Sequence, residues 1–467
     1  MGVMARPPAS SPFEPLCVAS APADPESIAA LRGMAVRSPH GVALESGPGF
    51  GAVGRFSVFA AEPDAVLSAD ELGWRLTGAD AGRIDPDARL DFFSALRRCF
   101  EATRRDTEVE LPFRGGWVGY LSYDLAPALE RLPRRLPSDG FAPLACFSHY
   151  SKAWVVDHEA RAIHRIGTER TPPSPGVESG ALRPAALAPP KSITAKAEYL
   201  RKVERILEYI RAGDCYQVNL SHRFDAELRP DWEAERDLPA LWNRCLRTSP
   251  APFAALLRQP DFFVASTSPE RFLRLETNGV VETRPIKGTR PRGLNPDADR
   301  RALAELLSSA KDQAELAMIV DLERNDLGRV CEYGSVRVSR HAVADSYANV
   351  HHLSSVVEGK LRADRDAVDL LKATFPGGSI TGAPKIRAME IIDELEDCRR
   401  GVYTGAIGYV DDGGRADFNI AIRTLVAKGR QVRYHVGGGI VADSDPEAEY
   451  QETLDKGAKL FAILTES

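Results

Sequence analysis

The 467-residue chain lacks the features of a membrane protein, a nucleic-acid binder or a disulfide-rich secreted protein. Its seven cysteines are scattered without a CxxC pair, which is typical of reduced thiols and not of a disulfide framework or zinc site. Its net charge of −6 contrasts with the basic excess of general nucleic-acid binders. No apolar run approaches the roughly 18 residues that span a bilayer, and the first residues lack the apolar core of a signal peptide. We therefore expect a cytoplasmic protein with neither nucleic acid nor membrane as a partner.

The composition is that of a globular protein with an ample core, since 43% of residues are hydrophobic and 27% are charged. One stretch interrupts this pattern: residues 171–190 carry six prolines and no apolar periodicity. Such a segment is typical of a linker or a long exposed excursion. It predicts an N-terminal region at 1–170, a linker at 171–191 and a second domain at 192–467.

Strand-like and helical patterns both occur, and the strands come in runs. The expected strands are 55–61, 115–124, 150–158, 262–267, 405–411 and 431–437. The expected helices are 194–213, 297–310, 311–326, 365–374, 383–396 and 446–465. Because strands do not alternate strictly with helices, the order favours an α+β fold, with antiparallel sheets covered by helices, over a doubly wound parallel sheet.

Two nucleotide-binding patterns are incomplete. Residues 49–54 (GFGAVG) match GxGxxG, but a strand-like run follows where a dinucleotide site needs a helix. Residues 377–385 (GGSITGAPK) have the spaced glycines of a P-loop, but alanine and proline stand where lysine and serine or threonine are required. Neither pattern supports a nucleotide cofactor.

A cluster of cations stands out in residues 283–293 (TRPIKGTRPRG), where Lys287 accompanies Arg284, Arg290 and Arg292. A loop selected only for solubility would contain both positively and negatively charged side chains. Two functional interpretations remain open at this point. Either the cluster binds an anion, or neighbouring cations favour the neutral, nucleophilic form of Lys287.

Carboxylates fall on one face of each of two expected helices, 311–326 and 444–464. A solvated charged face is the ordinary explanation for either helix alone. Together, however, they offer oxygen ligands from two elements, as a magnesium site requires. A run of three glycines just before the second helix is expected to form a turn that approaches a ligand closely and offers N–H groups to an anion. The residues are Asp312 and Glu315 on the first helix, Glu449, Glu452 and Lys456 on the second, and Gly437, Gly438 and Gly439 in the run.

Four long motifs in this order resemble the chorismate-utilising enzymes, which include anthranilate synthase, aminodeoxychorismate synthase, isochorismate synthase and salicylate synthase. Shorter segments of the N-terminal part resemble the same family more loosely. The resemblance implies two packed antiparallel β-sheets flanked by helices, and an enzyme that binds chorismate with Mg²⁺. The motifs are TRPIKGTRPRG, AELAMIVDLERNDLGR (314–329), GGSITGAPKIRAMEIIDELE (377–396) and GGGIVADSDPEAEYQETLDK (437–456); the looser matches are ALES (43–46), GRFSVFAAEP (54–63) and GGWVGYLSYD (115–124).

Positions that match the family motifs imply roles for individual residues. Glu315 and Glu452 would be direct metal ligands, with Glu449 and Asp312 in support. Glu270, in TSPERF (267–272), would be the general acid that expels the 4-hydroxyl of chorismate, and apolar neighbours are expected to raise its pKa. The implied substrate-binding residues are Gln217, Thr289, His352, Tyr403, Arg423, Gly437, Gly438, Gly439 and Lys456.

Two positions separate the branches of the family. Isochorismate and salicylate synthases carry a lysine base where this chain has Gln217, and glutamine cannot activate water near neutral pH. Anthranilate synthases have PIAGT where this chain has PIKGT, the form found in aminodeoxychorismate synthases. The resemblance therefore implies that Lys287 attacks C2 of chorismate and that ammonia then attacks C4, a step toward 4-aminobenzoate and folate.

The same resemblance implies a partner and leaves two alternatives open. No glutaminase nucleophile motif is present, so a separate glutamine amidotransferase subunit is expected to supply ammonia. The first alternative is anthranilate synthase component I, which Lys287 disfavours. The second is a tryptophan-binding regulatory subunit, suggested by an effector pocket that would include Glu45 and Ser46; the complete set of acid, metal ligands and lysine argues against it.

Overall fold

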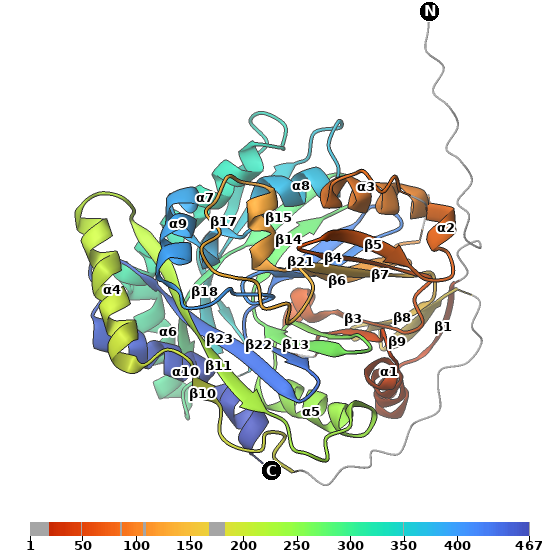
Figure 1. Ribbon diagram of the computed structural model, residues 1–467, viewed down its shortest axis with the longest axis horizontal. Coiled ribbons are helices and arrows are strands. Elements are labelled where there is room, and N and C mark those ends of the chain that lie inside the picture. Colours follow the sequence, from red (N-terminus) through yellow and green to blue (C-terminus); the bar gives the residue numbers. More distant parts are fainter. Residues whose placement is uncertain are drawn as a thin grey trace, which may run out of the picture.

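The computed structural model describes residues 18–47, 49–84, 86–105, 109–167, 183–348 and 350–466. Within these ranges, two large antiparallel sheets pack together and helices cover their outer sides (Figure 1). This confirms the predicted α+β class. Most of the predicted linker, residues 171–182, lies outside the described residues, so the two predicted domain boundaries stay predictions. Strands from before and after that linker nevertheless share both sheets.

The first sheet contains 12 described strands and joins the N-terminal region to the second half of the chain. Its central contact is between β2 and β12, where Leu44 lies opposite Ala255. Strand β19 pairs with β11 beside the main path. In spatial order the strands are β1 (Val18–Pro22), β9 (Ala162–Ile166), β8 (Ala153–Asp157), β3 (Phe56–Ala60), β2 (Val42–Glu45), β12 (Phe253–Arg258), β13 (Phe262–Ser268), β22 (Thr424–Lys428), β23 (Gln431–Ile440), β11 (Gln217–Glu227) and β10 (Lys191–Ser192), with β19 (Gly382–Ala383).

The second sheet contains 11 described strands and is likewise shared. Strand β6 pairs with β20, so residues 116–121 lie beside residues 406–411. Strand β17 pairs with β18 outside the main path. In spatial order the strands are β16 (Ile286–Pro291), β18 (Val350–Lys360), β15 (Val280–Arg284), β14 (Arg271–Leu275), β21 (Ala416–Ile420), β20 (Ala406–Asp411), β6 (Gly116–Leu121), β7 (Ala145–Tyr150), β4 (Ala65–Asp70) and β5 (Gly73–Thr77), with β17 (Arg337–Ser346).

The helices lie around the sheets, and those expected between residues 194 and 465 are all present. Residues 51–54 form a short 3₁₀ helix that leads into strand β3, which confirms the strand predicted after the GxGxxG match. The α-helices are α1 (Pro25–Arg37), α2 (Ala81–Ile84), α3 (Phe92–Thr103), α4 (Lys196–Arg211), α5 (Ala234–Thr248), α6 (Pro296–Ser308), α7 (Ala310–Gly328), α8 (Ala367–Thr374), α9 (Lys385–Leu395) and α10 (Pro446–Thr465). The 3₁₀ helices are η1 (Gly51–Gly54), η2 (Tyr123–Ala128) and η3 (Gly378–Ile380).

Three apolar clusters hold these layers together. One lies between the sheets, where Val58 and Val155 of the first sheet meet Val118 and Tyr120 of the second. A second joins the first sheet to α1, α5 and α10, and a third lies under α3, α7, α8 and α9. Burying apolar surface is the main favourable term in folding, so the sheet pair forms a fixed frame for residues at its edges.

The two helices with the predicted carboxylates have well-defined starts. The Ser309 hydroxyl accepts a hydrogen bond from the Asp312 N–H at 3.3 Å and caps α7. The Asp445 carboxylate accepts one from the Ala448 N–H at 2.9 Å, with Pro446 in the first turn of α10. Such caps satisfy backbone donors that a helix N-terminus leaves free. They fix where each helix begins and therefore which face its carboxylates occupy.

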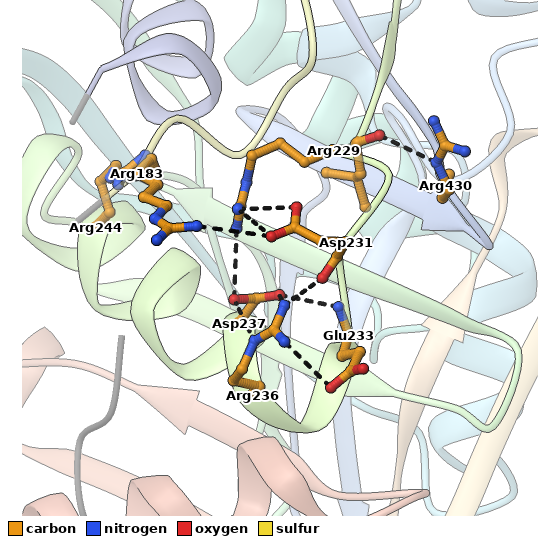
Figure 2. A network of polar contacts seen from close by, with 9 residues as sticks. Arg183, Arg229, Asp231, Glu233, Arg236, Asp237, Arg244 and Arg430 are labelled. Carbon is orange, nitrogen blue, oxygen red and sulfur yellow. Dashed lines mark hydrogen bonds and ion pairs between the residues drawn. The ribbon is translucent and has the colours of Figure 1, made fainter. Parts of the chain in front are cut away.

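A network of polar contacts at the start of α5 holds Arg183, a described residue of the predicted linker, against the rest of the fold (Figure 2). Arg229 pairs with Asp231 at 3.1 Å and with Asp237 at 3.5 Å, and Arg236 pairs with Asp237 at 2.8 Å. Arg244 donates to the Arg183 carbonyl at 2.8 Å. The first described residue after the gap, Arg183, is thus anchored beside α5.

None of the helices in the described ranges is both long enough and apolar enough to cross a membrane.

Candidate active site

Lys287 lies in β16, and its Nζ is 3.7 Å from Glu315 Oε2 of α7. Each arginine of the segment, however, pairs with a carboxylate of its own. Arg284 pairs with Glu282 at 3.4 Å, Arg290 with Glu305 at 2.7 Å and Arg292 with Asp299 at 2.7 Å. The sequence interpretation in which guanidinium groups favour a neutral Lys287 is therefore not supported by this geometry.

Glu270 lies between β13 and β14 and is only 6% exposed. Burial raises the pKa of Glu270 to about 7, while the Ser379 hydroxyl, the Lys287 charge and the Ile286 N–H favour its ionised form and limit the rise. The predicted effect of burial is thus present and stronger than the sequence suggested. A carboxyl with this pKa is protonated in a large share of molecules at neutral pH, as a general acid must be.

Carboxylates of α10 converge on the backbone of β23. A Cβ placed on Gly438 would lie 3.2 Å from Glu449 Oε2, 3.7 Å from Glu452 Oε1 and 3.8 Å from Lys456 Nζ. Lys456 also lies 2.6 Å from Glu452 Oε1 and donates to the Gly437 carbonyl at 3.2 Å. The predicted set of Glu449, Glu452 and Lys456 therefore gathers at one point of the strand.

The three glycines belong to β23 and do not form the predicted turn. Gly437, Gly438 and Gly439 pair with Ser221, Leu220 and Asn219 of β11. A side chain would not fit, because a Cβ on Gly437 would lie 2.6 Å from the Leu220 carbonyl oxygen and one on Gly439 would lie 3.1 Å from Gln217 Cδ. Glycine is needed here for close packing across the strands and not for a turn.

The carboxylates of α7 lie close to those of α10. Lys311 Nζ is 4.0 Å from Glu315 Oε1, and its charge also acts on Glu449 and Glu452. Burial and the charge of Glu452 raise the pKa of Glu449, whose Oε1 accepts a hydrogen bond from the Ser444 hydroxyl at 2.6 Å. Asp312, the remaining predicted ligand, pairs with Arg290 at 3.3 Å.

The donor chemistry of this cluster fits Mg²⁺, although the ligands are not gathered around one point. Carboxylate oxygens come from two helices, and the mutual repulsion of Glu449 and Glu452 is what a hard cation relieves. Among the described residues, no three metal-ligating side chains lie together closely enough to hold an ion. The carboxylates are instead paired with Lys287, Lys311 and Lys456. A metal ion would have to displace these lysines.

Gln217 is fully buried at the start of β11, beside Gly439. In the described part of the chain, neither its amide oxygen nor its amide nitrogen has a hydrogen-bond partner. An unpaired buried amide costs free energy, so the position is costly unless a ligand satisfies it. The structure thus places Gln217 against the strand that carries the three glycines, and its role in substrate binding stays a prediction.

Thr289, His352 and Arg423 form a second part of the site. The Thr289 hydroxyl lies 2.8 Å from His352 Nδ1. Burial and the charge of Arg423 lower the pKa of His352 to about 4, so its imidazole is neutral at neutral pH. Burial also lowers the pKa of Arg423, whose backbone has a positive φ of 51°. A non-glycine residue in this conformation is uncommon and is found often at functional sites.

Tyr403 stands at the inner end of the site, 6% exposed. Its ring stacks on His435 with centroids 5.3 Å apart and an interplanar angle of 13°. Burial raises the pKa of Tyr403 well above its usual value, so the phenol stays neutral and can donate a hydrogen bond. The neighbouring Arg400 donates to the Asn219 carbonyl at 2.6 Å and holds this segment against β11.

A sequence profile of chorismate binding enzymes matches residues 55–462. Aminodeoxychorismate synthase component 1 of Salmonella typhimurium is 41% identical over 434 residues, which make up 90% of this chain and 91% of that protein. The chain belongs to the chorismate-binding enzyme family. It is therefore an enzyme that acts on chorismate.

Two other relatives place this chorismate-binding enzyme close to a second branch of the family. Anthranilate synthase component 1 of Cereibacter sphaeroides is 37% identical over 461 residues, covering 89% of this chain and 87% of that protein. The crystal structure of anthranilate synthase component I from Streptococcus pneumoniae matches with a TM-score of 0.73 and 33% identity, covering 90% of this chain and 93% of that one. Overall similarity alone therefore does not separate the two activities.

The residues of the possible effector pocket lie far from Lys287 in the sequence, and one of them, Glu45, borders a cavity that Lys287 does not line. Glu45 lines a cavity of about 450 Å³ between the sheets, together with Phe253, Arg271 and Asn419. The Glu45 carboxylate is already held by Arg32 at 2.7 Å and by the Trp242 N–H at 2.5 Å. The hydroxyl of Ser46 donates to the Pro252 carbonyl at 2.8 Å. Effector binding at this cavity stays a prediction.

Two ionisable residues at the site of this chorismate-binding enzyme escaped the sequence interpretation. Lys459 of α10 is partly buried, and burial together with the charge of Arg423 lowers its pKa. Glu323 of α7 is buried near Glu270. Lys459 lies one turn after Lys456, so helical spacing could have indicated it. The burial of Glu323 gave no sequence signal, because charged residues surround it in the chain.

Proposed function

We propose that this chorismate-binding enzyme is aminodeoxychorismate synthase component I, which converts chorismate and ammonia into 4-amino-4-deoxychorismate. The observation that carries the proposal is the placement of Lys287, whose Nζ lies 3.7 Å from Glu315 Oε2. The charge of Lys287 also acts on the buried acid Glu270, so nucleophile and acid can serve one reacting centre. The similarity to aminodeoxychorismate synthases of known sequence supports the same conclusion.

In the proposed reaction, the neutral Lys287 amine attacks C2 of the ring and the two conjugated ring double bonds shift toward C4. The C4–O bond breaks, and the departing hydroxide takes the proton of Glu270 to leave as water. Ammonia then attacks C4, both double bonds shift back and the C2–N bond to Lys287 breaks. The proton that the new amine loses returns to Glu270, so the acid is restored. Covalent catalysis of this kind replaces one difficult step with two easier ones.

Gln217 excludes the competing reaction with water. A lysine at this position could remove a proton from water, whereas an amide cannot act as a base near neutral pH. The unpaired amide of Gln217 can instead hydrogen-bond to the substrate or to the incoming ammonia. This role agrees with a product that carries nitrogen at C4.

Cations and neutral donors bind the two carboxylates of chorismate in this proposal. Arg423 and Lys459 lie together without a carboxylate partner in the described part of the chain, and they would bind one carboxylate. Thr289, neutral His352 and Tyr403 would donate hydrogen bonds around it. A buried guanidinium without a carboxylate is costly unless a ligand supplies one.

The residues that would hold Mg²⁺ are Glu315 and Glu452, with Glu449 and Asp312 in support. When bound, the ion would neutralise the ring carboxylate and orient it. Lys456, which donates to the Gly437 carbonyl of β23, would complete the binding of that carboxylate. These assignments rest on the donor types that meet between α7 and α10.

The ammonia is proposed to come from a separate glutamine amidotransferase subunit. Glu270, Gln217 and Lys287 are buried or largely buried, so ammonia delivered by a partner would be protected from loss to solvent. This proposal rests on the family resemblance and on the chemistry that the site needs.

The product formed from chorismate, Mg²⁺ and an ammonium salt tests the proposal, with separation by chromatography and detection by mass. We expect 4-amino-4-deoxychorismate, which retains the enolpyruvyl group. Anthranilate with release of pyruvate would instead assign the chain to the anthranilate synthase branch. Isochorismate would contradict the role given to Gln217.

A further inference from the structure

The glycine-rich segment at residues 49–54 (GFGAVG) presents one aromatic ring to the part of the chain that carries the candidate active site. The Phe50 ring lies against the Tyr347 ring, with centroids 5.1 Å apart and an interplanar angle of 58°. Phe50 directly precedes η1 in the N-terminal region, whereas Tyr347 lies between β17 and β18. The two rings therefore join segments that are far apart in the sequence.

The three glycines of this segment are explained by the placement of Phe50. Gly49 and Gly51, on either side of Phe50, have positive φ angles of 103° and 56°, a conformation that glycine adopts more readily than other residues. A Cβ on Gly54 would lie 2.6 Å from Phe50 Cβ and 2.8 Å from the Gly47 carbonyl oxygen. The GxGxxG pattern thus turns the chain around Phe50 and lets this residue pack on Gly54.

Tyr347 extends the contact to the candidate active site. Its ring meets the imidazole of His352 edge to face, with centroids 6.0 Å apart and an interplanar angle of 62°. Aromatic pairs favour such arrangements at centroid distances of about 4.5–7 Å. His352 is 2% exposed, and its Nδ1 lies 2.8 Å from the Thr289 hydroxyl. One continuous row of contacts therefore runs from Phe50 through Tyr347 and His352 to Thr289.

The backbone of Tyr347 is held by hydrogen bonds. The Tyr347 N–H donates to the Val350 carbonyl at 2.8 Å. Arg292 donates to the Tyr347 carbonyl at 2.7 Å, and its Nε lies 2.7 Å from Asp299 Oδ1 of α6. These contacts fix the path of the main chain, whereas the rotamer of the half-buried Tyr347 ring depends on the rings that pack against it. Phe50 supplies one of these rings.

We propose that Phe50 is a positioning residue for chorismate binding, which orients His352 through Tyr347. This inference rests on the proposed function, since it takes His352 as a substrate-binding residue, but it does not depend on where nitrogen enters the ring. The N-terminal region thereby acts on the active site through a row of packed rings. A side chain that is already oriented loses little conformational freedom when a ligand binds. Phe50 therefore raises the affinity for chorismate and not the rate of the bond-breaking steps.

Michaelis parameters of Phe50→Ala, measured as consumption of chorismate, test the proposal. We expect KM for chorismate to rise roughly twofold to tenfold, as the loss of one aromatic contact predicts, with kcat within about twofold of wild type. Phe50→Tyr, which keeps the ring, should keep KM near that of wild type, whereas Phe50→Leu, which keeps only apolar bulk, should not. The matched control Phe92→Ala removes a half-buried ring that pairs with Phe93 at 5.4 Å and should leave KM unchanged.

A double-mutant cycle decides whether Phe50 acts through Tyr347. Tyr347→Leu should raise KM at least as much as Phe50→Ala, and the double variant should match Tyr347→Leu alone, because one path carries both effects. Effects that multiply in the double variant would overturn the proposal. So would an unchanged KM in Phe50→Ala, or a fall in kcat at constant KM. If thermal unfolding shows that Phe50→Ala has lost its fold, Phe50→Leu takes its place in the cycle.

NMR of the substrate-free enzyme with isotope-labelled histidine separates this inference from the proposed function, because it needs no turnover. His352→Gln assigns the ring signals of His352 among those of the nine histidines. We expect these signals to shift in Phe50→Ala, to return in Phe50→Tyr and to stay in place in Phe92→Ala. Identical His352 signals in Phe50→Ala and wild type would overturn the positioning role and leave the proposed reaction intact. Formation of anthranilate would overturn the proposed reaction and leave the shifts in KM and in the His352 signals unchanged.

Discussion

Lys287 Nζ lies 3.7 Å from Glu315 Oε2, so the proposed nucleophile and a proposed metal ligand form an ion pair between β16 and α7. Glu315 thus has two roles that exclude each other at one moment, as partner of Lys287 or as ligand of Mg²⁺. Binding of the ion would release Lys287 from this carboxylate. The contact therefore links a carboxylate of the proposed magnesium site to Lys287, which stands where anthranilate synthases have alanine.

Glu452→Gln should abolish turnover of chorismate while leaving the fold intact, because a hard oxygen ligand loses its charge. Glu315→Gln should behave alike. Initial rates measured across a Mg²⁺ titration check this. The matched control is Glu447→Gln, an exposed carboxylate of the same helix that pairs with Lys196, and it should retain activity. Full wild-type activity in excess chelator would contradict the magnesium assignment.

Glu270→Gln should become more stable relative to wild type as the pH rises. Burial raises the pKa of Glu270 from 4.5 to about 7, so between these values the folded protein holds a proton that the unfolded chain releases. Stability from this group is present below the lower value and is lost as the pH rises through the upper one. Thermal unfolding of both proteins between pH 4.5 and about 7 measures the difference in stability between them. A difference that does not change with pH would contradict this prediction.

Lys459→Met should weaken chorismate binding several-fold with little change in kcat, because the substrate keeps Arg423 but loses the second cation. Michaelis parameters separate the two effects. Lys428→Met, which removes an exposed lysine whose ammonium donates to the Gly140 carbonyl, is the control and should leave KM unchanged. A large loss of kcat with constant KM would place Lys459 in the chemical step instead.

The purified chain should use ammonium salts at elevated pH but not glutamine, since free ammonia is the nucleophile. Addition of a glutamine amidotransferase partner should confer glutamine-dependent synthesis. Product formation with each nitrogen source, with and without the partner, provides the measurement. Glutamine hydrolysis by the chain alone would reveal a catalytic site that the described residues do not account for.

Much of the fold could be predicted because local patterns agreed with the final structure. The apolar face of α4 and the capping residues of α7 and α10 fix these helices by local chemistry. The sharing of both sheets between the two halves of the chain could not be read from the sequence. Pairings such as β2 with β12 join segments about 200 residues apart, and no local pattern encodes them.

The motifs named residues of the candidate site, but they did not indicate how those residues are arranged in space. Lys287 and Glu315 come from separate motifs and form an ion pair, and the charge of Lys287 acts on Glu452. Arg290 and Arg292 turn to carboxylates of α6, and Arg284 pairs with Glu282 of its own strand, β15. The glycines enter a strand, because strand pairing decides their positions. Glu323 was missed since the burial of a charged side chain depends on what packs over it.

Lys287→Ala should lower the rate of 4-amino-4-deoxychorismate formation on the order of 10²-fold or more, because the covalent step is lost while acid and substrate contacts remain. Lys287→Arg should not restore it, since a guanidinium stays charged. Product analysis of all three proteins at equal concentration checks this, and some anthranilate from the alanine variant would agree with direct attack at C2. If Lys287→Arg retained good activity, the role of Lys287 would be only to balance charge.

Mass spectrometry of the wild-type enzyme mixed with chorismate and Mg²⁺ in the absence of ammonia tests the central claim most directly. The covalent step can then form but not resolve. We predict a chorismate-derived adduct on the peptide that contains Lys287, and its absence from Lys287→Ala. An unmodified peptide, together with near-normal 4-amino product from the alanine variant, would contradict the nucleophilic role of Lys287 and reopen the choice between the two amino-chorismate enzymes.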